Sequence, residues 1–89
     1  MLIKFYFEIV EVSQNQAYAL FKRNDDEYGW LEICNGELVR GDILEEIAPR
    51  SFLKCGIIDC VINGRAKAKI NVQDYGPEDY IRNEYNRWK

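Results

Sequence analysis

The stretch of sequence that decides the fold runs from Gly56 to Val72 and reads GIIDCVINGRAKAKINV. Its Asn63-Gly64 pair separates two segments of strand-forming residues, and this arrangement is a strong signal for a β-hairpin. A two-residue turn of type I′ would place Ile62 directly opposite Arg65. The pair therefore predicts both a hairpin and one particular register.

In this register the two faces of the hairpin differ in chemistry. Arg65, Lys67 and Lys69 repeat at every second position, so they project from one face as a basic stripe. Asp59 falls on the opposite face, where its neighbours are apolar. These neighbours are Ile57, Val61, Ala66, Ala68 and Ile70. An unpartnered carboxylate is costly in such a place, so we interpret Asp59 as a buried or partnered carboxylate with a structural role.

Residues 2–34 predict a meander of three antiparallel strands. Apolar and polar side chains alternate from Ile3 to Ile9, which is the period of a strand with one buried face. The polar segments 13–16 and 24–27 separate this strand from the second and the second from the third. We expect the acidic run Asp25-Asp26-Glu27 to form a solvated hairpin tip.

Residues 35–54 predict an irregular connection between this meander and the hairpin over residues 55–74. A second Asn-Gly pair, at 35–36, could turn the chain into a short strand over residues 37–40. Residues 42–48 fit either a short helix with Asp42 as its N-cap or a strand. We favour a strand or a mixed turn for this segment.

Residues 77–88 predict an amphipathic helix, because Pro77 suits the first helical position and two carboxylates follow it in the first turn. Four apolar or aromatic side chains then fall on one side at helical spacing. They are Tyr80, Ile81, Tyr85 and Trp88. The simplest interpretation is that this stripe docks on the sheet, and the alternative is that it binds a protein partner or a second copy of the chain.

Together these elements predict one compact domain over residues 1–89 with a mainly β fold. We expect a small antiparallel barrel of five or six strands with a C-terminal amphipathic helix. The order of elements resembles that of oligonucleotide-binding (OB-like) and SH3-like barrels. This is a resemblance of architecture alone, so it implies a fold and no particular function.

The composition excludes several functional classes. The chain has no histidine, which removes the commonest general base and the commonest metal ligand. Cys34, Cys55 and Cys60 lack the paired spacing of a disulfide framework or a zinc site, so we expect reduced thiols and a cytoplasmic location. No apolar segment of about 18 residues is present. We therefore expect no enzymatic activity, no cofactor, no metal and no membrane partner.

Two functional hypotheses remain. The first is a non-enzymatic interaction module that binds a protein or a second copy of itself through the C-terminal helix or an unpaired sheet edge. The second is a single-stranded nucleic-acid-binding barrel that uses Arg65, Lys67 and Lys69 together with neighbouring aromatic rings. A net charge of −3 argues against a surface for polyanions, so we favour a protein partner or a homo-oligomer.

Overall fold

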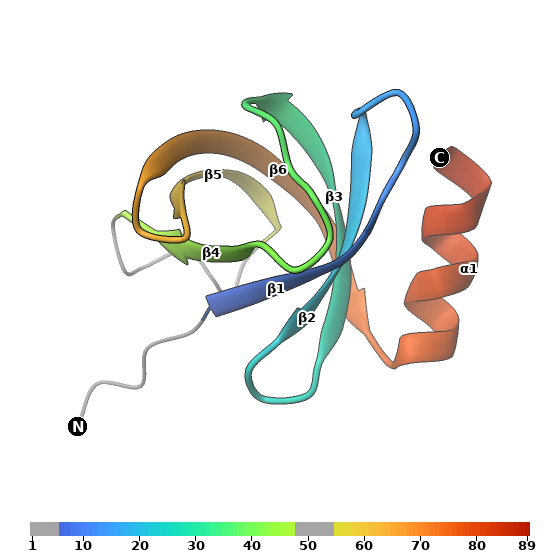
Figure 1. Cartoon of the computed structure of the whole chain (residues 1–89). Coiled ribbons are helices and arrows are strands. Elements are labelled where there is room, and N and C mark those ends of the chain that lie inside the picture. Colours follow the sequence, from blue (N-terminus) through green and yellow to red (C-terminus); the bar gives the residue numbers. More distant parts are fainter. Residues whose placement is uncertain (1–5, 48–54) are drawn as a thin grey trace.

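The structure is a closed β-barrel with one helix packed against its side (Figure 1). The computed structural model describes residues 6–47 and 55–89. Its elements are β1 (Tyr6–Val12), β2 (Tyr18–Arg23), β3 (Tyr28–Asn35), β4 (Ile43–Glu46), β5 (Gly56–Ile62), β6 (Ala66–Gly76) and α1 (Glu78–Trp88). The strand order is β1-β2-β3-β6-β5-β4, and β1 pairs with β4 to close the barrel. The predicted mainly β barrel with a C-terminal helix is confirmed.

The predicted register of the β5–β6 hairpin is wrong by one residue. Ile62 pairs with Ala66 rather than with Arg65, so the turn contains three residues, and Arg65 belongs to it. The turn keeps the Asn-Gly conformation, because Asn63 and Gly64 have φ angles of 53° and 71°, and the Arg65 N–H donates to the Ile62 carbonyl at 2.9 Å.

The extra residue brings the apolar sets of both strands to the same face. Ile58, Cys60 and Ile62 of β5 point inward together with three apolar residues of β6. These are Ala68, Ile70 and Val72. The predicted register would have buried Asp59 and exposed half of these side chains, which costs burial energy at every position.

Contacts with β4 hold the turn in this register. The Asn63 N–H donates to the Ile43 carbonyl at 2.8 Å, and the Asn63 side-chain oxygen accepts from the Ile43 N–H at 2.9 Å. The Asn63 amide nitrogen also donates to the Asp42 carboxylate at 3.1 Å. Asp42 is therefore a turn residue that ties the connection to the hairpin, and the helical alternative for this segment does not occur.

The connection before β4 also differs from its prediction. Residues 37–40 form no strand, because the chain instead turns inward and buries Leu38 in the barrel core. Gln16 holds this loop by donating to the Leu38 carbonyl at 2.9 Å and accepting from the Leu38 N–H at 3.1 Å. Residues 2–5 of the predicted meander and residues 48–54 of the predicted connection lie outside the described residues.

The helix docks on its own barrel. It packs against β2, β3 and β6, and Ile81 and Tyr85 are buried there with Leu20 and Trp30. Leu20 and Trp30 point outward from the barrel, so β2 and β3 are apolar on both faces. The simpler interpretation of the predicted stripe therefore holds for its two central residues.

Gly29 gives a direct test of core packing. A Cβ atom at Gly29 would lie 2.3 Å from the ring of Phe21 and 2.8 Å from the Asp74 carbonyl oxygen. We expect Gly29→Ala to lower the free energy of unfolding by about 1–3 kcal/mol, since overpacking forces side chains and backbone to shift. Urea denaturation measures the effect.

The control removes the ring that causes the clash. In a Phe21→Leu background the same Gly29→Ala change should cost less, because part of the crowded volume is then empty. Equal costs in the two backgrounds would contradict the packing described here.

Candidate functional site

One side of the barrel is left uncovered by the helix. Figure 1 shows α1 on the side away from β4 and β5, and within the described residues the helix contacts neither strand. The outward side chains of β4, β5 and the first half of β6, with the residue after β4, form what we call the open face. Its members are Glu45, Ile47, Ile57, Asp59, Val61, Lys67 and Lys69.

Exposed aliphatic side chains flank an ion pair on the open face. Ile57, which lies in β5, is 65% exposed, and Ile47, which directly follows β4, is 51% exposed. Both lie next to Asp59, since the Ile47 N–H donates to the Asp59 carbonyl and Ile57 comes two residues earlier in β5. The Lys69 ammonium lies 3.9 Å from the Asp59 carboxylate. A shallow hollow of about 350 Å³ opens on this face, and Ile47, Asp59 and Lys69 contribute to its lining.

Asp59 is not on the apolar face of the hairpin, as the predicted register required. It points outward, and its side chain is 66% exposed. The shift of one residue places it opposite Lys69, which is its partner. Its carboxylate is therefore partnered but not buried, and exposed pairs of this kind contribute little to stability.

The three predicted basic residues are not equivalent. Lys67 and Lys69 are exposed on the outer face of β6, whereas Arg65 lies in the turn. The basic stripe thus survives as two strand residues, and it shares its face with Asp59 instead of opposing it.

The four predicted helix residues divide into two pairs. Ile81 and Tyr85 are buried against the barrel, whereas Tyr80 and Trp88 are 48% and 57% exposed. Burial raises the pKa of the Tyr85 phenol above its usual range. Tyr80 donates from its hydroxyl to the Asp74 carboxylate at 2.9 Å, which ties the first turn of α1 to the end of β6.

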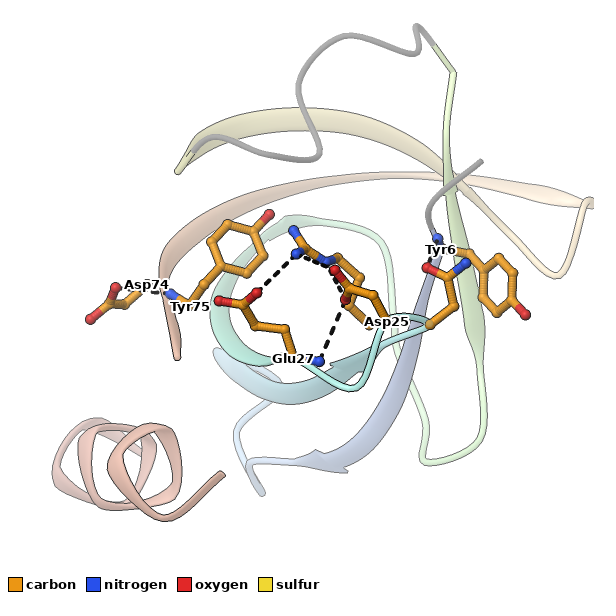
Figure 2. Close-up of polar contacts among 7 residues, drawn as sticks. Tyr6, Asp25, Glu27, Asp74 and Tyr75 are labelled. Carbon is orange, nitrogen blue, oxygen red and sulfur yellow. Dashed lines mark hydrogen bonds and ion pairs between the residues drawn. The ribbon is translucent and has the colours of Figure 1, made fainter. Parts of the chain in front are cut away.

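The polar cluster at one end of the barrel was missed by sequence reasoning. Arg23 lies inside this end with only 7% of its side chain exposed. Its guanidinium donates to both Asp25 oxygens at 2.7 and 2.6 Å and to Glu27 at 3.0 Å. Figure 2 shows Asp25 and Glu27 converging with Tyr75 beside them, and the guanidinium lies 5.0 Å from the Tyr75 ring centre. The acidic run is therefore an anchored tip rather than a freely solvated one.

This cluster fits a structural role better than a catalytic one. Hydrogen bonding from Arg23 holds the pKa of Asp25 below its usual range, so Asp25 is ionised at neutral pH and cannot act as a proton donor. Burial raises the pKa of the Tyr75 phenol, which therefore stays protonated. The sequence does contain an indication of this cluster. Arg23 falls at the same alternate positions as Ala19 and Phe21, which places its side chain on the inward face of β2.

The cysteines show no paired chemistry. All three are free thiols: Cys34 and Cys55 are exposed, and Cys60 is buried with its pKa raised to about 11 by desolvation. The described residues contain no group of three or more His, Cys, Asp or Glu side chains arranged to hold a metal ion. Within the same residues, α1 lacks the length and the apolar character needed to cross a bilayer.

Comparison with protein-family models, with curated proteins and with solved structures gives no match for this chain. The candidate sites therefore rest on the geometry and chemistry of the chain itself.

The Arg23 cluster predicts a particular dependence of stability on pH. Because the folded-state pKa of Asp25 is lowered, its contribution is fully present above the unfolded-state value of about 3.9 and is lost as the pH falls through the folded-state value. We expect Asp25→Asn to lower the free energy of unfolding at pH 7. Below about pH 4, the free energies of unfolding of the variant and of the native sequence should become more similar. Urea denaturation at several pH values measures both effects.

Asp26→Asn is the matched control in the same turn. Its carboxylate is 87% exposed and pairs with Lys22 at 3.3 Å on the surface. The control should change stability little at either pH. A variant at Asp25 that behaved like the one at Asp26 would contradict the anchoring role of the cluster.

Proposed function

We propose that this chain is a non-enzymatic interaction module that binds protein through the open face, and that the occupant is a second copy of the chain. The observation that carries the proposal is the exposure of Ile57 and Ile47 around the Asp59–Lys69 pair. Exposed apolar side chains beside charged groups are typical of protein interfaces. Burying them in an interface would remove this apolar surface from water.

The order of charges across the open face supports a second copy as the occupant. Cross-strand pairing places Glu45 of β4, Val61 of β5 and Lys67 of β6 in one row. An acid and a base thus lie about 10 Å apart, on either side of an aliphatic residue. A twofold axis through the centre of this row would bring Lys67 of each copy to Glu45 of the other, which is the self-complementarity of an isologous interface.

The other two surfaces suggested by the sequence are occupied within the chain. The apolar stripe of the helix has its central residues, Ile81 and Tyr85, buried against the barrel. Every described strand has two neighbours in the closed barrel, so none presents a sheet edge along its full length. Among these surfaces, the open face is the one that combines exposed aliphatic side chains with an ion pair.

The nucleic-acid alternative has weaker support. In an OB-like or SH3-like barrel that binds single strands, a basic groove would follow the phosphates. Here Lys69 is paired with Asp59, and Glu45 lies in the same face as Lys67. The open face is therefore close to neutral, which gives little counterion release on binding a polyanion.

Replacing Ile57 tests the proposed interface. We expect the native chain to dimerise, and Ile57→Asp to weaken dimerisation at least about tenfold, because burying such a side chain contributes about 1.5–3 kcal/mol. Val39→Asp is the control, since Val39 is 61% exposed but lies outside the open face. Sedimentation velocity over a range of concentrations measures the dimer, and a native chain that stayed monomeric throughout would refute the proposal.

Reversing charges tests the twofold arrangement. Lys67→Glu should weaken the dimer because it opposes Glu45 of the other copy, and adding Glu45→Lys should restore it. A double variant no better than Lys67→Glu alone would count against this symmetry. Salt-sensitive binding of a labelled single-stranded oligonucleotide, lost in Lys67→Glu/Lys69→Glu, would favour the nucleic-acid alternative instead.

A further inference from the structure

A second hollow lies where the last turn of α1 meets the barrel, away from β4. Its volume is about 280 Å³, and its lining combines aromatic rings with a carboxylate and two amides. The residues are Tyr18, Trp30, Glu32, Asn71, Gln73 and Trp88. They come from four elements, β2, β3, β6 and α1. Nothing in the interaction proposed for the open face requires this hollow.

The aromatic part of the hollow is held in place by packing. Trp30 is only 6% exposed and lies against the buried side of the helix. Its ring centre is 5.9 Å from that of Tyr18, with a tilt of 60°, and 6.2 Å from that of Trp88, with the planes nearly parallel. Trp88 stays 57% exposed at the end of α1. The Trp88 ring thus leaves aromatic surface beside Trp30 that a ligand can contact.

A carboxylate lies in the same hollow. Cross-strand pairing places Glu32 between Tyr18 on β2 and Asn71 on β6, so the three side chains form one outward row. Neighbours in such a row have Cβ atoms about 4.5–5.5 Å apart. Glu32 is half-buried, and within the described residues its carboxylate has neither a hydrogen bond nor an ion-pair partner. A carboxylate without a cationic partner favours a ligand that supplies one.

Of the two amides in the hollow, Gln73 also offers an acceptor to a cation. Gln73 donates from its amide nitrogen to the Asn71 carbonyl at 3.1 Å. This bond leaves the side-chain oxygen of Gln73 as an acceptor. Acceptor oxygens and aromatic faces both carry negative potential, so they attract positive charge and disfavour anions.

We propose that this hollow binds an organic cation of the alkylammonium class, with methylated ammonium groups as the best fit. The cation would lie against the Tyr18 and Trp88 rings and be balanced by Glu32. Rings contribute through cation–π attraction, which is strongest for tryptophan and for ligands that shed their water readily. Quaternary ammonium groups meet that condition because they have no N–H donors to hydrate.

Intrinsic fluorescence measures binding directly, because both tryptophans of the chain, Trp30 and Trp88, line the hollow. The probes are choline and its neutral isostere 3,3-dimethylbutan-1-ol. Choline should change the fluorescence saturably, and the isostere should bind at least about tenfold more weakly, since it has the same shape without the charge. No saturable change with choline, or equal binding of the two probes, would overturn the proposal.

Two variants test the assigned roles. Glu32→Gln keeps the shape of the side chain and should weaken choline binding about tenfold, whereas Glu37→Gln, in an exposed loop, should leave binding unchanged. Trp88→Ala should abolish the binding reported by Trp30, with circular dichroism as the check that α1 persists. Unchanged affinity in Glu32→Gln would refute the ionic role of Glu32.

A further probe separates two sources of the same cation. Nα-acetyl-trimethyllysine presents the ammonium group as a methylated protein would, whereas choline presents it as a free small molecule. Choline binding remains the requirement; tighter Glu32-dependent binding of Nα-acetyl-trimethyllysine would then identify a methylated protein as the source, and weaker binding a free small molecule.

Discussion

The register of the β5–β6 hairpin determines which side chains fill the barrel and which face solvent. With Arg65 in the turn, the apolar residues of both strands point inward together, and Asp59 meets Lys69 on the outside. A shift of one residue would reverse β5 relative to β6, because side chains alternate at every position. The composition of the core, the composition of the open face and the exposed ion pair all follow from this register.

Closure of the barrel and docking of the helix then divide the outer surface into two regions. The helix covers β2 and β3, where outward Leu20 and Trp30 receive it, and its last turn creates the aromatic hollow. The far side keeps exposed aliphatic groups beside opposite charges. A single small core thus supports both the open face and, on the other side of the barrel, the aromatic hollow.

Local patterns predicted most of the elements, and long-range contacts decided the rest. The alternation of apolar and polar side chains predicted the strands of the meander and the hairpin. Pro77 and the apolar stripe predicted the helix. The turn length depended on Asn63 bonding to β4, which lies 20 residues earlier in the chain. Arg23 was missed because an inward arginine needs partners, and only the folded turn brings Asp25 and Glu27 to it. The aromatic hollow likewise combines residues that no local pattern connects.

Cross-strand backbone NOEs in the β5–β6 hairpin test the central claim most directly. The structure predicts contacts that connect Ile62 with Ala66, Cys60 with Ala68, and Ile58 with Ile70. A two-residue turn would instead connect Ile62 with Arg65 and Cys60 with Lys67. Observation of that second pattern would contradict the register and, with it, the composition of the core and of the open face.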